Sequence, residues 1–327
     1  MKIFFSGAIP SPVHQRGATA LLGIFDTELG QVVEQTTYHP PPELHAPGQK
    51  VQFTGFSFVG TRLYVCTHNA VLRFDDWPPR EPASHISLPG FNDLHHCLPW
   101  EGGLVVANTG LETVDLVSLD GVLKERWDVL GDVPDARAID PQRDYRLIPD
   151  TKPHLCHPNH VFLLGGELWV TRLRTQDAIC IGLPDRRILF PEGMPHDGSL
   201  IGEDHVFTTV NGHLIKIDPA GDRAQRSWRL ADFDPDFDEM GWCRGVCADP
   251  ENPDGVYVAF SMVRRPRWRE IGYRIKHLHN APPSRLCRFD LRERRLVDCW
   301  QVGENNGHVL FQIQPLDERG GAGPGST

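Results

Sequence analysis

Short runs of strand-forming residues recur along this 327-residue chain, and they constrain its fold more than any other feature. In residues 96–107 and 160–171, a histidine opens the run and a Gly-Gly turn separates two apolar stretches. Glycine replaces that histidine in three further copies, which begin at Gly55, Gly198 and Gly245. Apolar runs bounded by turn residues predict antiparallel strands, and a helical period is nearly absent.

Each copy continues into a third strand that ends at an aspartate, and a fourth strand often follows. These third strands are residues 71–75, 114–120, 214–218 and 286–290. Four antiparallel strands that repeat every ~40–55 residues are typical of a β-propeller. The sequence therefore predicts an all-β fold of this kind.

The two ends of the chain complete the repeat. Residues 2–7, 20–26 and 31–33 supply the second, third and fourth strands of one blade, and residues 308–313 supply its first strand. Pairing the N- and C-terminal strands closes a six-bladed ring and removes exposed strand edges. We predict a single propeller domain over residues 1–318, with insertions at 131–158 and 263–284, and a flexible tail at 319–327.

Composition and charge limit the kinds of partner and the cellular compartment that we expect for this chain. The net charge of −10 disfavours nucleic acid and anionic membrane surfaces, and leaves a small molecule as the expected partner. The chain has no apolar run of the ~18–20 residues that a transmembrane helix needs, and no secretory signal at its start, so we predict a cytoplasmic protein. Its 8 cysteines lie mostly in apolar runs and are expected to be reduced. The oligomeric state is left open.

One aligned position at the start of the first strands is histidine or glycine in every blade. Around the ring it is occupied by His308, Gly55, His96, His160, Gly198 and Gly245. First strands line the channel of a propeller, so these imidazoles would meet near the axis while the glycines leave room for a substrate. Three neutral histidines with open positions suit Fe, Zn or Cu. We therefore predict a metal site formed by His96, His160 and His308, with His196 and Asn159 as further ligands.

The preceding position is almost wholly polar and supplies candidate catalytic groups. The guanidinium fork of Arg244 suits a carboxylate or phosphate, although a structural pairing with an aspartate is an equal alternative. Asp197 is expected to orient a ligand or to coordinate the metal directly. His95 is the third candidate, because either His95 or His96 can face the channel. A single histidine at a strand start is more often a hydrogen-bonded structural residue than a ligand.

These repeats resemble the six-bladed propellers of the gluconolactonase and regucalcin type, with NHL-repeat and strictosidine-synthase relatives. The resemblance implies a divalent cation on the axis, often calcium, held by carboxylate and Asn side chains. Asn159 in Pro158-Asn159-His160 and Asp197 before Gly198 are similar to that pattern. The chain departs from it where the family has Glu, at His308, and where the family has Arg or Asn, in the third blade, which here carries two adjacent histidines.

The leading functional hypothesis is a metal-dependent enzyme that acts on a small anionic substrate at a histidine-lined axial site. The metal would support Lewis-acid hydrolysis, lyase chemistry or O₂ chemistry. The arginine-rich insertion at 263–284 would be either a lid over this site or a solvated loop. Two alternatives remain open: a non-catalytic propeller that binds a ligand or a protein, and a calcium-dependent lactonase-like hydrolase that uses Asn159 and Asp197.

Overall fold

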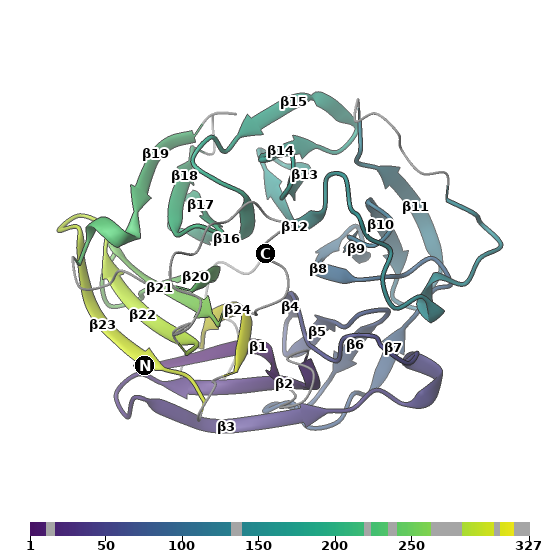
Figure 1. The fold of residues 1–327 in the computed structure, drawn as a ribbon, viewed down its shortest axis with the longest axis horizontal. Coiled ribbons are helices and arrows are strands. Elements are labelled where there is room, and N and C mark those ends of the chain that lie inside the picture. The colour runs from purple at the N-terminus through teal and green to yellow at the C-terminus, as the bar shows by residue number, and fades with distance from the viewer. Residues whose placement is uncertain are drawn as a thin grey trace.

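The computed structural model describes residues 1–10, 17–131, 139–218, 224–234, 241–262, 283–303 and 308–316. Within these residues, six four-stranded antiparallel sheets are arranged as blades around a central axis (Figure 1). The predicted all-β six-bladed propeller is therefore confirmed. The tail at 319–327 and most of the 263–284 insertion lie outside the described residues.

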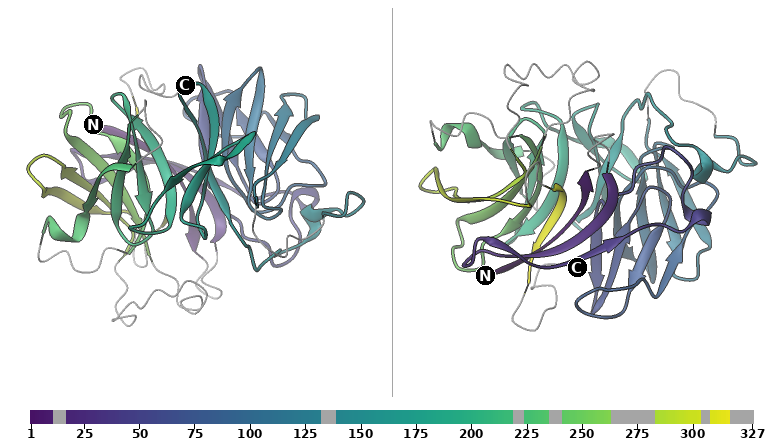
Figure 2. Two further views of the ribbon diagram at one scale, coloured as in Figure 1. Left: turned by 90° about the horizontal axis from the view of Figure 1, so that it is seen from above. Right: turned by 60° about the horizontal axis from the view of Figure 1, so that its bottom comes forward.

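The first blade is built from both ends of the chain. Its strands, from the axis outward, are β24 (Val309–Pro315), β1 (Lys2–Pro10), β2 (Gly17–Asp26) and β3 (Gln31–Tyr38). Strand β1 pairs antiparallel with β2 on one side and with β24 on the other. This pairing closes the ring, as the sequence predicts, and Figure 2 shows β24 beside β1 from a second direction.

The other five blades follow the chain order, and in each the first strand is the innermost. The second and third blades are β4 (Phe56–Val59), β5 (Arg62–Cys66), β6 (Val71–Phe74), β7 (Ser84–Ile86), and β8 (Leu94–Trp100), β9 (Gly103–Asn108), β10 (Thr113–Ser118), β11 (Leu123–Asp128). The fourth and fifth are β12 (Pro158–Leu164), β13 (Glu167–Arg172), β14 (Asp177–Cys180), β15 (Leu183–Leu189), and β16 (Pro195–Ile201), β17 (Asp204–Thr209), β18 (His213–Ile217), β19 (Ala224–Arg229). The sixth is β20 (Trp242–Ala248), β21 (Gly255–Ser261), β22 (Arg285–Asp290), β23 (Arg295–Gln301).

Helical structure is limited, in the described residues, to three short 3-10 turns. These are η1 (Pro42–Leu44), η2 (Tyr145–Leu147) and η3 (Leu230–Asp232). None of these turns has the length and apolar character of a membrane-spanning helix. Turn η2 lies in the predicted 131–158 insertion. The turn packs on the third blade, where Asn92 donates hydrogen bonds to the carbonyls of Tyr145 and Ile148 at 2.7 and 2.8 Å.

The core consists of apolar side chains packed between neighbouring blades, as expected for sheets that each bury both faces. One buried ion pair interrupts it in the fourth blade. Arg172 donates to both carboxylate oxygens of Asp177, and also to the carbonyls of Val129 and Leu130 from the linker before the blade. Arg172 and Asp177 are 1% and 2% exposed, so all of the donors and acceptors in this pair need the partners that they have.

The cysteines differ in part from the expectation. Six are buried free thiols, which agrees with the predicted reduced state: Cys66, Cys97, Cys156, Cys180, Cys243 and Cys247. Cys287 and Cys299 instead form a disulfide. These two residues are direct register partners on β22 and β23, a relation that depends on strand pairing and is not visible in their sequence spacing.

Candidate functional site

Two cavities occupy opposite ends of the channel. The first, which we call the strand-start cavity, has a volume of about 190 Å³ and is lined by residues at the beginnings of β8, β16, β20 and β24. The second, which we call the strand-end cavity, has a volume of about 450 Å³ and is lined mainly by residues farther along the six inner strands, together with His205 of β17. The predicted axial site is thus divided between two separate cavities.

The strand-start cavity concentrates imidazole and positive charge. Its lining includes His95, His154, His157 and His196, together with Lys50, Lys152, Arg174 and Arg244. Among the described residues that line it there is no Asp or Glu. In a chain of net charge −10, four cations without a lining carboxylate make a local positive potential that favours anions.

A β-bulge near the start of the inner strands sets the direction of these side chains. The pairing register shifts between Leu94 and His96 in β8, between Pro195 and Gly198 in β16, and between Cys243 and Val246 in β20. A bulge leaves a residue out of the ladder and re-aims its side chain. His95, His196 and Arg244 lie within these bulges, which explains how three different blades direct polar groups to one cavity.

The loop before β12 supplies His154 and His157, and one carboxylate fixes its shape. Oε1 of Glu112 accepts hydrogen bonds from the backbone N–H groups of Leu155, Cys156 and His157 at 2.6, 2.6 and 3.0 Å. Three successive amides bound to one oxygen hold the loop rigidly. The two imidazoles then meet through their Nδ1 atoms at 2.7 Å, so one nitrogen carries the shared proton and the other accepts it.

Arg244 and His196 form the polar contact on the opposite wall. Nη1 of Arg244 lies 3.1 Å from Nε2 of His196. A guanidinium can only donate, so Nε2 of His196 accepts and the proton of this neutral imidazole is on Nδ1. That Nδ1 atom is buried and has no hydrogen-bond partner among the described residues. The guanidinium also stacks on Phe311, 4.0 Å from the ring centroid, and on Trp242, which limits its movement.

Burial keeps all four of these histidines neutral at pH 7. It lowers the pKa of His95 to about 3 and the pKa of His154 to about 4, although the carboxylate of Asp93 acts in the opposite direction on both. Burial and neighbouring groups also hold the pKa of His157 and His196 well below the ordinary value. For His196 the largest charge effect is that of Arg244. Neutral imidazoles in contact with cations are ready to accept a proton when negative charge arrives.

Asp93 is a buried carboxylate whose Oδ1 lies 3.8 Å from Nε2 of His95. Lys50 donates to both of its oxygens, at 2.8 and 3.0 Å. Burial alone would raise the pKa of Asp93, but Lys50, His95 and His68 hold it well below its usual range. Its negative charge is therefore already paired with Lys50 and only partly offsets the positive potential of the cavity.

His96 and His160 belong to the strand-end cavity, with their rings 4.2 Å apart. The backbone N–H of Val161 donates to Nδ1 of His96 at 3.3 Å, and the same ring hydrogen-bonds to the backbone of Phe56. Burial lowers the pKa of His96 well below its usual value. His96 therefore acts as a structural link between three blades. Nδ1 of His160 lies 2.9 Å from Oδ1 of Asp197, which also accepts the N–H of Gly198.

The structure does not bring the five predicted metal ligands together. His196 faces the strand-start cavity, and Asn159 donates to the Pro195 carbonyl at 3.4 Å while its own Oδ1 is buried without a partner among the described residues. His308 precedes β24, where its N–H binds the Val302 carbonyl and its ring lies against Gly303. In the part of the chain that the structure describes, no three His, Cys, Asp or Glu side chains are arranged to hold a metal ion. Among the described residues, the five predicted ligands therefore do not form one common site.

Gln312 occupies the place that the sequence alignment assigned to His308. It lines the strand-end cavity with His96 and His160, and its Oε1 accepts the N–H of Phe56 at 2.7 Å. The glycines of the column also differ from expectation. A Cβ atom at Gly55 would lie 2.6 Å from Cδ2 of His96, so this glycine makes room for the neighbouring histidine and not for a substrate.

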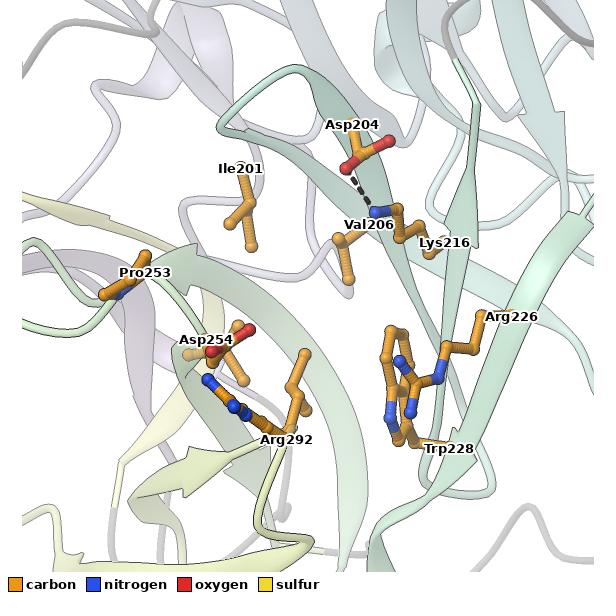
Figure 3. A pocket seen from close by; sticks show the side chains of 11 residues that line it. Ile201, Asp204, Val206, Lys216, Arg226, Trp228, Pro253, Asp254 and Arg292 are labelled. Atoms are coloured by element: carbon orange, nitrogen blue, oxygen red, sulfur yellow. Dashed lines mark ion pairs between the residues drawn. The ribbon is translucent and has the colours of Figure 1, made fainter.

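A third cavity, of about 440 Å³, lies between the fifth and sixth blades (Figure 3). It carries charges of both signs: Asp204 pairs with Lys216 at 2.5 Å, and Arg226 lies over the ring of Trp228, with Asp254 on the facing wall. This cavity lacks the imidazoles of the strand-start cavity, and its three cations are opposed by two lining carboxylates.

Sequence reasoning missed several groups of the strand-start cavity. Lys50, Lys152 and Arg174 lie in loops outside the repeated strand pattern, and Arg174 follows β13. Lys152, His154 and His157 lie in the histidine-rich residues 152–160, within which the sequence predicts Asn159 and His160 as metal ligands.

No known protein family and no characterised protein matches the sequence. Solved structures match its fold. A propeller in the nidogen/laminin complex is 11% identical over 96% of this chain and 97% of that chain, with a TM-score of 0.54. Virginiamycin B lyase from Staphylococcus aureus is 11% identical over 78% of this chain and 71% of its own, with a TM-score of 0.47. The propeller domain of Myceliophteria thermophila Cps50 (Swd1) gives 12% identity, 88% and 81% coverage, and a TM-score of 0.49. At these identities the similarity extends to the fold only.

Proposed function

We propose that this chain is a propeller enzyme that binds a small anionic molecule in the strand-start cavity and moves protons with the neutral histidines there. The observation that carries the proposal is the lining itself: four Lys or Arg residues, four histidines and, among the described residues, no carboxylate. This supports the anionic substrate expected from the sequence.

Arg244 is the proposed anchor of the substrate. Its guanidinium is fixed between His196 and the ring of Phe311, and planar guanidinium groups bind carboxylate and phosphate oxygens in pairs. Lys50 and Lys152 also line the cavity; Lys50 is paired with Asp93, and Nζ of Lys152 lies 3.9 Å from Oδ1 of Asp150. The side chain of Lys50 is 18% exposed, so these charges are weakly screened by solvent compared with those of a surface patch.

The His154–His157 pair and His95 are the proposed proton carriers. Proton transfer by a positioned imidazole needs a neutral base next to the reacting group, and burial provides the neutral form here. An anion within about 4–6 Å favours the charged form of a histidine. Binding of the anion would therefore draw a proton onto one of these imidazoles. The transition-metal cofactor, with calcium as the alternative, remains a prediction from the sequence, and no step of this proposal requires it.

A non-catalytic ligand-binding propeller is the second candidate. It is favoured by the arrangement of His96, whose ring hydrogen-bonds to backbone groups of two neighbouring blades and so serves the fold. In that case the strand-start cavity would bind an anion without proton transfer. Proton uptake during binding therefore distinguishes the two candidates.

Calorimetric titration with sulfate tests the proposal, because sulfate is an anion that does not itself titrate near neutral pH. The matched variants are Arg244→Met and Arg226→Met: each removes an arginine that stacks on a tryptophan, but only Arg244 lines the strand-start cavity. We expect Arg244→Met to weaken sulfate binding at least ~10-fold, the loss of a charge-assisted contact, and Arg226→Met to leave it unchanged.

The same titration at pH 6 in two cationic buffers of different ionisation enthalpy counts the protons taken up. Uptake of a fraction of a proton or more per sulfate is expected for the enzyme. Equal sulfate affinity in the two arginine variants would refute the anion site. Binding without proton uptake would refute the proton-transfer role and leave the non-catalytic candidate.

A further inference from the structure

The strand-end cavity has the features of a second ligand site, at the opposite end of the channel from the anion site. Its volume of about 450 Å³ is in the range of small-molecule pockets. Most of its wall is apolar and comes from all six blades, including Phe56, Phe58, Leu98, Leu163, Leu200 and Ile313. Among the described residues that line it there is no Asp, Glu, Lys or Arg. This wall favours a neutral ligand, in contrast to the strand-start cavity.

The imidazole of His160 provides one polar contact. The other polar residues of the lining are Ser57, His96, Ser199, His205, Gln312 and Gln314. Nδ1 of His160 lies 2.9 Å from Oδ1 of Asp197, and each side chain is 9% exposed. The carboxylate attracts the imidazole N–H, so this short contact favours a proton on Nδ1 and a lone pair on Nε2, although the two groups are not aligned as a hydrogen bond. The ring of His160 lines the cavity. The cavity therefore contains a fixed acceptor.

Neighbouring residues hold this imidazole in place. The ring of His96 lies 4.2 Å from it, centroid to centroid, with an angle of 31° between the planes. On the other side, Cδ2 of His160 would lie 3.4 Å from a Cβ atom at Gly198, and Phe207 fills the space behind that glycine. A ring fixed by a carboxylate and by packing on its faces presents its acceptor in one direction, which favours recognition of a single donor.

We propose that the strand-end cavity binds a neutral, largely apolar molecule whose hydroxyl group donates a hydrogen bond to Nε2 of His160. Apolar contacts with the wall supply most of the affinity, and the hydroxyl fixes the orientation. Asp197 is a positioning residue in this arrangement, since it sets the tautomer of His160 and does not itself line the cavity. The site is independent of the proposed anion site and of any enzymatic activity there.

The probes are 2-naphthol and naphthalene, two fluorescent molecules of nearly equal size that differ by one hydroxyl. We expect the unmodified protein to bind 2-naphthol about 5-fold more tightly than naphthalene, the factor that corresponds to one net hydrogen bond. His160→Phe keeps an aromatic ring at this position and should remove that preference while both probes still bind. Sulfate at saturating concentration should not displace either probe.

A second pair of variants locates the probes even if His160→Phe fails to fold. Leu200 and Ile201 are adjacent in β16, but Leu200 lines the strand-end cavity and Ile201 lines the cavity between the fifth and sixth blades. Leu200→Trp should reduce binding of both probes more than 10-fold, whereas Ile201→Trp should not. Equal binding of the two probes to the unmodified protein, equal behaviour of the two tryptophan variants, or displacement by sulfate would each overturn the proposal.

Discussion

Acidification from pH 7 to pH 5 should destabilise this protein through the buried histidines of the strand-start cavity. In the unfolded chain a histidine has a pKa near 6.5. Burial lowers the pKa of His95 to about 3 in the folded protein. Below pH 6.5 the unfolded chain therefore binds a proton at this histidine, whereas the folded chain does not. Stability is lost as the pH falls, and the loss continues until the folded pKa near 3 is reached.

The size of this effect follows from the two pKa values. At pH 5 the unfolded imidazole is almost fully protonated while the folded one remains neutral, which removes about 2 kcal/mol per histidine relative to pH 7. The value changes little if the folded pKa is shifted by a unit, because any folded pKa below about 4 leaves the imidazole neutral at pH 5. Burial lowers the pKa of His154 to about 4, so His154 should contribute nearly the same amount.

Urea unfolding at pH 7 and pH 5 measures this effect, with His95→Gln as the perturbation and His85→Gln as the control. His85 is an exposed histidine on β7, and glutamine is neutral at both pH values. The loss of stability between the two pH values should be about 2 kcal/mol smaller in His95→Gln than in the unmodified protein, and unchanged in His85→Gln. An equal loss in His95→Gln would show that the folded protein can protonate His95, and would refute the reasoning.

Two further predictions concern groups that hold the site in place. Arg172→Met should lower the free energy of unfolding in urea by about 3–5 kcal/mol, because the carboxylate of Asp177 stays buried without its partner. Arg186→Met removes an exposed ion pair and should lower it by less than about 1 kcal/mol. Similar losses in the two variants would contradict the argument. Glu112→Gln weakens the acceptor for the amides of residues 155–157. It should therefore lower the free energy of unfolding by about 1–3 kcal/mol and weaken sulfate binding. An unchanged sulfate affinity would show that this loop does not contribute to the anion site.

The fold could be predicted because its signal is repeated. Each blade alone gives a weak strand pattern, but six copies with the same order of turn and apolar run leave few alternatives. In the sequence, the N-terminal repeat has no first strand before it and the C-terminal strand has no following partners. Together these two observations predict the β1–β24 pairing that the structure has. The Cys287–Cys299 disulfide escaped prediction because it depends on the register of β22 against β23.

The site could be predicted only in part, because its geometry depends on bulges and loops. The sequence identified the inner-strand starts as the polar positions, and Arg244, His95 and His196 do line one cavity. The face of the strand on which each side chain lies could not be predicted from the sequence, because one extra residue in a bulge reverses the alternation of side chains between the two faces of a strand. The first blade has its inner strand at the other end of the chain, so its alignment slipped by four residues, from Gln312 to His308.

Strand β16 connects the two cavities, and this connection determines which substitutions are informative. His196 lines the strand-start cavity, and the next residue, Asp197, binds His160 in the strand-end cavity. A substitution of His196 or Asp197 would disturb both ends at once and could not assign a ligand to either. Arg244 and Leu200 each line only one of the two cavities, so a change in ligand binding at these positions identifies the cavity that is responsible.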